Sequence, residues 1–346
     1  MCRANSRSMH AGPNQVNVSV GDTIQSSGGA AGLQALAKMS SKKSMADVLK
    51  EAKAEEVRVK QEEIASKDSL AAAKLALRRF RAASKALSFK HVATPLTALV
   101  GSLDDLDVLR RGAADADGII HTAFGLDISR IQELAAQDRR AIETFGEVFA
   151  GSARPIIVTD GFLHLTGEKA KETDRPEIMP AFPRASQQTA FALAERGIHA
   201  SVVRNPRSVH GKGETHGFVP MLAAVAREKG VSAYVGDGDN LWPAVHRLDA
   251  ARVYRLALER GARGEAYHAV AEEGVPYRAI AEAIGRQLGL PTTSLTPEEA
   301  EEHFGALAMW VANNGPASNE WTRRILGWTP EQVGIVADIE RPDYAA

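Results

Sequence analysis

The pattern of hydrophobic and polar positions divides the chain into three zones. Residues 1–45 contain many Gly, Ser and Ala residues and few large apolar side chains. Such a segment buries too little surface to offset its ordering entropy, so we expect a disordered tail. Residues 46–87 have a helical pattern that is polar in its first half and apolar on one face in its second half. We interpret them as a helical extension packed on the body, with a partner-binding helix as the alternative.

From about residue 82, short β-rich segments alternate with helical patterns. The candidate strands are Ala93–Val100, Gly118–Ala123, Pro155–Thr159, His199–Val203 and Ala266–Val270. The candidate helices are Asp104–Ala113, Ser129–Phe149, Arg184–Arg196 and Gly217–Lys229. This alternation is typical of βαβ units, whose strands form a parallel sheet.

The last third of the chain is more helical. A helix is predicted to open at Val275-Pro276-Tyr277 and to end before Gly289. Thr296-Pro297-Glu298-Glu299 has the pattern of an N-cap, a proline at the first helical position and acids in the first turn, which predicts a helix to Ala312. A short helix over Asn319–Leu326 follows. The pattern therefore predicts an α/β body with a small, mostly helical C-terminal lobe.

Composition narrows the class of protein. The 346 residues are 44% hydrophobic and 25% charged, with a formal net charge of −1, so no charge excess favours nucleic acid or a membrane surface. No apolar run approaches the ~18 residues of a membrane span. The single cysteine, Cys2, forms no internal disulfide, which indicates a reducing compartment, and we expect a cytoplasmic protein. The Ser-containing, acid-poor N-terminus leaves an organellar transit peptide as the alternative to a plain tail.

Seven short motifs follow one another in order. They are Gly101–Leu106, Ile119–Phe124, Ile156–Thr159, Arg204–Gly211, Gly236–Gly238, Val245–Asp249, and Tyr267–Val270 followed by the helix at Val275. In this order the sequence resembles the extended branch of the short-chain dehydrogenase/reductase superfamily, the NAD-dependent epimerase/dehydratase family. The resemblance covers about residues 82–340. It implies a Rossmann-like parallel sheet with helices on both faces, NAD or NADP as cofactor, and a small-molecule substrate.

The resemblance implies cofactor contacts at the ends of two strands. Ligands of an open parallel sheet bind beyond the carboxyl ends of its strands. His121, Thr122 and Ala123 lie at such an end, and in the family this stretch lines the cofactor cleft; an incidental strand-end histidine is the alternative. Ser102 stands where the family usually has an acidic residue that contacts the adenine amino group, and its hydroxyl can still accept a hydrogen bond.

The loop Arg204–Gly211 is the segment for which we most expect a functional role. In the family this loop closes on the nicotinamide and begins the substrate pocket, whereas an ordinary surface loop is the alternative. The resemblance implies cofactor contacts for Arg204, Pro206, Ser208 and Val209, and substrate contacts for His210, Trp242 and His246. A core position is the alternative for Trp242. The histidines indicate no metal site, because His210 and His216 lack a carboxylate or cysteine set at ligand spacing.

The catalytic pair of the family is missing. A family reductase uses a tyrosine hydroxyl as general acid, with a lysine four residues later that lowers its pKa. None of the five tyrosines has a lysine at that spacing. Where the family places this helix, Arg184 or Ser186 is a candidate for a substitute catalytic role, with a solvated helix start as the alternative. Thr159 has the hydroxyl that binds the reacting carbonyl in the family, and Asp160 beside it is either a turn residue or an acid/base.

The glycine fingerprint that holds the cofactor pyrophosphate is also missing. No glycine lies between Gly32 and Gly101, where the fingerprint belongs. The only candidate is the strand-like run Gln15–Gly21 followed by Ser27–Gly32, in which the glycine spacing is wrong. The sequence therefore leaves cofactor binding open.

These observations give one domain plan and two function classes. Residues 88–260 are expected to form a Rossmann-like NAD(P)-binding domain with an incomplete first unit. Residues 261–346 are expected to form a substrate lobe, with contributions from residues 205–245. The leading function is an NAD(P)-dependent oxidoreductase or epimerase acting on a small carbonyl or hydroxyl substrate. The alternative is a non-catalytic binding or regulatory protein that has lost the cofactor. Neither nucleic acid nor membrane is an expected partner, and a homodimer is left open.

Overall fold

The computed structural model describes residues 17–19, 97–125, 127–162, 168–180, 182–214, 217–341 and 344. The chain divides into two units, residues 1–112 and 113–346. In the first unit, strand β1 (Asn17–Ser19) pairs in parallel with β2 (Thr97–Leu99), and helix α3 (Leu106–Ala114) begins. Strand β1 lies within the run Gln15–Gly21 that the sequence indicated. The rest of the expected tail and all of the expected helical extension lie outside the described residues.

The second unit contains a four-stranded sheet in the order β3-β4-β5-β9, in which all neighbours are parallel. The strands are β3 (Ile119–His121), β4 (Ile156–Gly161), β5 (Ala200–Asn205) and β9 (Ala266–His268). The apolar residues of β4 and β5 are fully buried, as expected for strands that are covered on both faces. The predicted parallel sheet is therefore confirmed.

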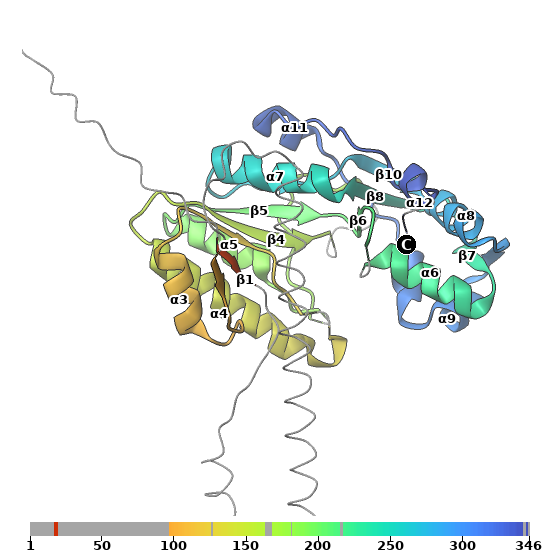
Figure 1. Ribbon diagram of the computed structural model, residues 1–346, viewed down its shortest axis with the longest axis horizontal. Coiled ribbons are helices and arrows are strands. Elements are labelled where there is room, and N and C mark those ends of the chain that lie inside the picture. Colours follow the sequence, from red (N-terminus) through yellow and green to blue (C-terminus); the bar gives the residue numbers. More distant parts are fainter. Residues whose placement is uncertain are drawn as a thin grey trace, which may run out of the picture. The chain divides into compact units, whose positions relative to one another are not determined.

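Helices cover both faces of this sheet (Figure 1). Helices α4 (Ile131–Phe149) and α5 (Ser186–Glu195) pack on one face, and α7 (Arg247–Arg260) packs on the other. A 3-10 turn, Ile128–Arg130, precedes α4. Helix α4 carries an apolar stripe at helical spacing from Ile131 to Phe149, and this stripe is buried. Burial of that stripe fixes which face of α4 meets the rest of the body.

The C-terminal lobe combines short helices with two small sheets. Its strands are β6 (Ser208–His210), β7 (Ser232–Val235), β8 (Leu241–His246), β10 (Glu272–Pro276) and β11 (Thr292–Leu295), paired as β10-β8-β6 and β11-β7. Its helices are α6 (Phe218–Lys229), α8 (Tyr277–Leu288), α9 (Pro297–Phe304), α10 (Ala308–Val311), α11 (Glu320–Leu326) and α12 (Ile335–Ile339), with a 3-10 turn at Gly305–Leu307. The two sheets were not predicted. The predicted cap before α9 is a full capping box, because Thr296 and Glu299 each accept a hydrogen bond from the other's backbone amide.

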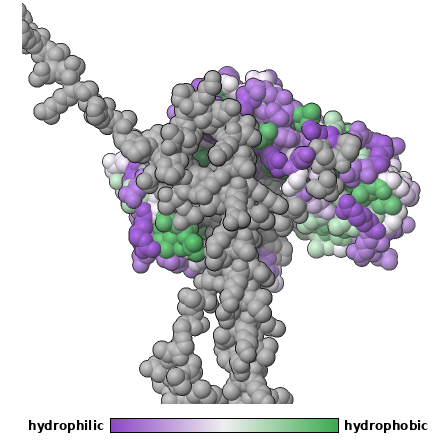
Figure 2. Space-filling view, in the orientation of Figure 1, coloured by the Kyte–Doolittle hydropathy of each residue, from purple (hydrophilic) through white to green (hydrophobic). Residues whose placement is uncertain are grey.

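The visible surface mixes hydrophilic and hydrophobic patches (Figure 2). The exposed large hydrophobic side chains include Leu248 on α7, Met309 on α10 and Ile325 on α11. Among the described residues, every helix is too short or too polar to cross a membrane.

Candidate active site at the end of the central strand

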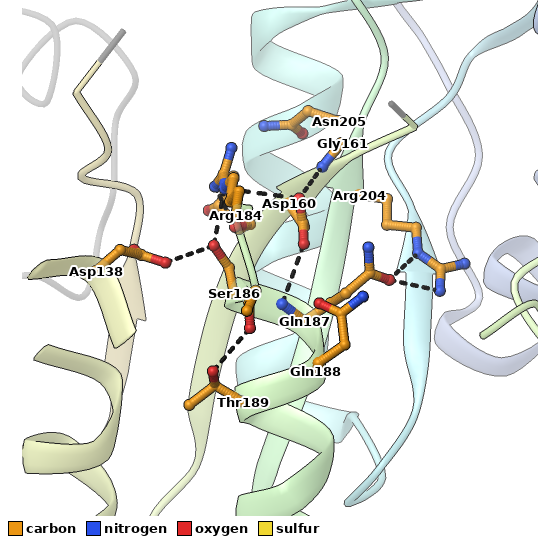
Figure 3. A network of polar contacts seen from close by, with 12 residues as sticks. Asp138, Asp160, Gly161, Arg184, Ser186, Gln187, Gln188, Thr189, Arg204 and Asn205 are labelled. Atoms are coloured by element: carbon orange, nitrogen blue, oxygen red, sulfur yellow. Dashed lines mark hydrogen bonds and ion pairs between the residues drawn. The ribbon is translucent and has the colours of Figure 1, made fainter. Parts of the chain in front are cut away.

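A polar network joins the carboxyl end of β4 to the first turn of α5 (Figure 3). Asp160, on β4, is buried, and its carboxylate accepts hydrogen bonds from the backbone N–H of Gly161 at 2.8 Å and of Gln187 at 3.0 Å. Helix α5 has no side-chain cap of its own, because its N-cap residue is Ala185. Asp160 therefore caps α5 from the neighbouring strand, where a carboxylate also interacts favourably with the helix dipole.

Arg184 places its guanidinium beside the same strand end. Its Nη2 donates to the carbonyl oxygen of Thr159 at 2.7 Å, and its Nε lies 3.7 Å from Asp160 Oδ1. The guanidinium carbon lies 4.1 Å from the ring centroid of Phe124, within the range of a cation–π contact. The side chain is only 13% exposed. A positive charge is therefore fixed close to where the resemblance implies a catalytic tyrosine.

A chain of hydrogen bonds continues from Arg184 to the end of β3. Arg184 Nε donates to Ser186 Oγ at 2.8 Å, and Ser186 Oγ donates to Asp138 Oδ2 at 2.6 Å. The other carboxylate oxygen of Asp138 lies 2.7 Å from His121 Nε2. Because a carboxylate accepts hydrogen bonds, His121 carries its proton on Nε2 in this contact. Asp138 thus links three residues that the sequence singled out.

The hydroxyl of Thr159 belongs to a second network. Thr159 Oγ1 lies 2.9 Å from the Tyr254 hydroxyl of α7, which accepts a hydrogen bond from Asn205 Nδ2 at 2.8 Å. Successive strand side chains point to opposite faces, so the side chains of Thr159 and Asp160 lie on different sides of β4. Burial raises the pKa of Tyr254 to about 12, so this hydroxyl keeps its proton near neutral pH. Because Asn205 donates to it, Tyr254 can donate its own proton to Thr159.

The expected cofactor contacts at strand ends differ in accessibility. His121 is buried, whereas Thr122 beyond it is exposed and Ala123 is half-buried. Ser102 lies in the first unit, where its half-buried hydroxyl accepts a hydrogen bond from the Asp104 backbone N–H at 3.3 Å. At the end of β3, the accessible positions are therefore the two small residues that follow the histidine.

Arg204, the first residue of the highlighted loop, points into the protein and is 0% exposed. Its five N–H donors have five acceptor contacts, which are Gln187 Oε1 twice, the Lys171 and Asp174 carbonyl oxygens, and His268 Nε2. Burial lowers the pKa of Arg204 to about 10, which still leaves it charged at neutral pH. A cofactor contact by this side chain would have to displace one of these bonds, and that contact stays a prediction.

The remaining loop residues and the two candidate substrate residues of β8 lie close together. Pro206, Ser208 and His210 are buried, while Val209 is half-buried. His210 Nδ1 lies 2.8 Å from Asp338 Oδ2 of α12. The ring of His210 meets that of His246 edge to face at 5.5 Å, and His246 caps α7 by accepting from the Leu248 backbone N–H.

Trp242 occupies the core of the lobe. It is fully buried, and its ring centroid lies 4.8 Å from Tyr277 and 5.6 Å from Phe218. These contacts place its ring in the core of the lobe, its indole N–H is buried without an acceptor, and the substrate contact of Trp242 stays a prediction. Within the described part of the chain, no group of three or more His, Cys, Asp or Glu side chains is placed to hold a metal ion.

Comparison with known proteins shows the family to which the chain belongs. No family model matches it. An uncharacterised protein of Schizosaccharomyces pombe is 45% identical over 250 residues, 72% of this chain and 84% of that protein. An uncharacterised protein of Saccharomyces cerevisiae is 41% identical over 267 residues, 77% of this chain and 89% of that protein. The chain belongs to the family of these two yeast proteins.

Solved structures show the fold of this family. The dTDP-glucose 4,6-dehydratase of Streptomyces venezuelae, solved with NAD, matches with a TM-score of 0.57 and 19% identity, over 72% of this chain and 80% of its own. The UDP-glucose 4-epimerase of Thermotoga maritima, solved with UDP-glucose, matches with a TM-score of 0.56 and 17% identity, over 71% and 82%. The fold is that of the NAD-dependent epimerases and dehydratases, which confirms the Rossmann-like architecture expected from the sequence.

The described residues leave small side chains at the ends of β3 and β4, where the cofactor contacts are predicted. Beyond β3, the exposed Thr122 and the half-buried Ala123 present small side chains at the sheet edge. At the end of β4, the one atom of the described residues that a Cβ added to Gly161 would meet within 4 Å is the Asn205 carbonyl oxygen, at 3.7 Å. The candidate glycine turn for the pyrophosphate lies outside the described residues.

The sequence missed two residues on which the networks of this fold depend. Asp138 lies four residues from both Leu134 and Ile142 in the apolar stripe of α4, so a lone carboxylate at core spacing was the signal that could have found it. Tyr254 gave no such signal, because its contact with Thr159 joins residues 95 positions apart.

Proposed function

We propose that the chain is a cytoplasmic NAD(P)-dependent oxidoreductase or epimerase that acts on a small carbonyl or hydroxyl substrate. In this proposal Arg184 stands in for the missing tyrosine and stabilises negative charge on the substrate oxygen. The observation that carries the proposal is the guanidinium held at the end of β4 by the Thr159 carbonyl, Ser186 and Asp160. Catalysis would take place on the body, residues 88–260, with the C-terminal lobe supplying substrate contacts.

The cofactor would lie along the ends of β3 and β4. Bound NAD or NADP supplies the exchange of a hydride with a substrate carbon. Thr122 and Ala123, with Pro206 and Val209 of the loop after β5, would hold and orient it. The NAD-containing dehydratase structure supports this assignment by its fold.

Arg184 acts in the proposal as a preorganised electrostatic group. A fixed cation aimed at developing negative charge contributes to rate without reorganising during the reaction. Ser186 and Asp138 are positioning residues, since they reach the substrate only through Arg184. The Thr159 hydroxyl, on the other side of β4 from Asp160, would donate its proton in a hydrogen bond to the substrate oxygen only if that oxygen lies beyond the strand end, while Tyr254 donates to Thr159.

Two measurements on the full chain test the proposal. Titration with NADH and NADPH should enhance cofactor fluorescence with micromolar affinity. Oxidation of the bound cofactor by a panel of aldehydes and ketones should then be slowed by Arg184→Met by about 100-fold or more in kcat, the cost of losing one such stabilising group. The matched control is Arg255→Gln, which removes an exposed arginine of α7 paired with Glu259 and should leave both readings unchanged.

Two outcomes would count against the proposal. Absence of binding at millimolar NADH and NADPH would favour the non-catalytic binding or regulatory protein. Turnover that is equal in the wild type and in Arg184→Met would remove Arg184 from the chemistry, whatever the cofactor affinity.

A further inference from the structure

Arg207 lies in the loop between β5 and β6, and its guanidinium stands between two tryptophans. The guanidinium carbon lies 5.5 Å from the ring centroid of Trp242 and 5.7 Å from that of Trp310. Nη2 donates to the Asn313 side-chain oxygen at 2.7 Å, and Nη1 donates to the Asn313 carbonyl oxygen at 3.4 Å. Both of these acceptors are uncharged, so the contacts orient the guanidinium without neutralising it.

No carboxylate of the described residues forms an ion pair with Arg207. Arg184, Arg252 and Arg278 each have an acidic partner within 4.0 Å, in Asp160, Asp249 and Glu282 respectively. Burial lowers the pKa of Arg207 to about 10, so the group keeps its charge at neutral pH. A partly desolvated charge that lacks a counter-charge is unfavourable, which makes an external anion a natural partner.

Unpaired polar atoms next to Arg207 point to the same missing partner. The indole N–H of Trp242, one of the two rings that face the guanidinium, is buried without an acceptor. The hydroxyl of Ser208, the residue that follows Arg207, is also buried without a partner. Among the described residues, Arg207 has no acidic partner, and Ser208 beside it in the chain and Trp242 beside its guanidinium each bury a donor without an acceptor. Unpaired donors next to a cation suit an anionic acceptor.

The loop that carries Arg207 starts at the sheet edge that holds the candidate active site. Gly161 at the end of β4 pairs with Asn205 at the end of β5, and Arg207 follows Asn205 by two residues. A ligand lying beyond these adjacent strand ends would therefore pass from the region of Arg184 toward this loop.

We propose that Arg207, with Ser208 and Trp242, forms a subsite for an anionic group of the substrate, a carboxylate or a phosphate. The subsite narrows the substrate class of the proposed oxidoreductase to small acids or phosphorylated compounds, and in that respect it rests on the proposed function. A planar guanidinium binds either anion through two parallel N–H donors, so the two share one chemistry.

The experiment titrates the full chain with inorganic phosphate and, separately, with succinate, against sodium chloride at matched ionic strength. Tryptophan fluorescence and the thermal midpoint are both recorded. We expect a saturable response to at least one anion, and its apparent Kd should rise by at least about tenfold in Arg207→Gln. Arg207→Lys, which keeps the charge but not the planar fork, should fall between the two. Whichever of phosphate and succinate saturates at lower concentration identifies the group.

The matched control is Arg278→Gln. Arg278 also faces an aromatic ring, that of Tyr234 at 5.4 Å, but it is paired with Glu282, so its loss should leave anion binding unchanged. A purely structural role for Arg207 would lower the thermal midpoint of Arg207→Gln by the same amount with and without anion. That result, or no saturable response of the wild type up to tens of millimolar anion, would overturn the subsite.

NADPH titration of the same variants separates this proposal from the proposed function. Wild-type and Arg207→Gln chains that bind NADPH equally, without saturable anion binding, would overturn the subsite alone. Anion binding that depends on Arg207 in a chain that binds neither NADH nor NADPH would support the subsite and would overturn the oxidoreductase.

Discussion

Replacing Ser186 by alanine tests the network that holds Arg184. The change removes one oxygen, which accepts from Arg184 Nε at 2.8 Å and donates to Asp138 Oδ2 at 2.6 Å. Each bond joins the Ser186 hydroxyl to an ionisable group, the Arg184 guanidinium or the Asp138 carboxyl. A hydrogen bond to a charged group contributes about 1.5–3 kcal/mol to stability. Ser186 is 0% exposed and Asp138 is 1% exposed, so water cannot replace the lost oxygen. Allowing for partial relaxation, we expect Ser186→Ala to lower the free energy of unfolding by about 2–4 kcal/mol.

The chain contains a matched control in Ser201. This serine of β5 is also 0% exposed, but its hydroxyl has no hydrogen-bond partner. Ser201→Ala should therefore leave stability unchanged or raise it by up to about 1 kcal/mol, because it removes an unsatisfied buried group. Urea unfolding followed by circular dichroism and tryptophan fluorescence measures both variants, and an unchanged slope m licenses comparison of the midpoints. Equal midpoints for the two variants would refute the energetic weight assigned to the network.

Two further predictions concern buried charges outside that network. Burial raises the pKa of Glu214 from 4.5 to about 7, so its contribution to stability is full below pH 4.5 and is lost as pH rises through 7. Glu214→Gln should therefore gain stability relative to wild type as pH rises from 4.5 to about 7 in urea unfolding and keep that gain above pH 7, and an unchanged pH dependence would contradict this. Arg204→Met should cost about 3–5 kcal/mol, because it leaves buried acceptors such as Gln187 Oε1 unpaired. Arg204→Lys should not restore the wild-type urea midpoint, and full recovery with lysine would show that charge rather than geometry holds the loop.

Local pattern was sufficient to predict the body of the fold. Strand β4 is a run of branched apolar residues, and helix α4 repeats its apolar positions at helical spacing, so each segment specifies its own structure and burial. The cap at Thr296 likewise depends only on neighbouring residues. The strands of the lobe were not predicted because they are short and combine apolar residues with charged, proline or glycine residues. Strand β8 contains Pro243, and β10 carries Glu272, Glu273 and Gly274, so neither shows a clear alternation of apolar and polar positions.

The candidate site was predictable where a motif carried it and not where distant residues meet. Thr159, Arg184 and Ser186 were singled out from their places in the family pattern, and in the structure Arg184 contacts Ser186 and the carbonyl oxygen of Thr159. Their catalytic roles stay predictions. The motifs could not show the direction in which each side chain points. Arg204 belongs to a conspicuous loop, yet its guanidinium turns inward to five acceptor contacts, because Gln187 and His268 from other segments lie on that side.

The presence of Arg184 near the expected tyrosine position changes what the proposed site can do with a proton. A guanidinium keeps its charge throughout the pH range in which proteins are folded, so Arg184 can stabilise an oxyanion but cannot donate a proton to it. The proton must then come from a hydroxyl or from water, and Thr159 with Tyr254 behind it is the hydroxyl pair at this strand end. Because the pKa of Tyr254 is raised to about 12, that pair does not titrate near neutrality. Under the proposed function, the rate should therefore lack the loss at moderately alkaline pH that a catalytic tyrosine of lowered pKa would impose. A kcat that falls by tenfold per pH unit above about pH 8 would instead require a titrating general acid other than Thr159 and Tyr254.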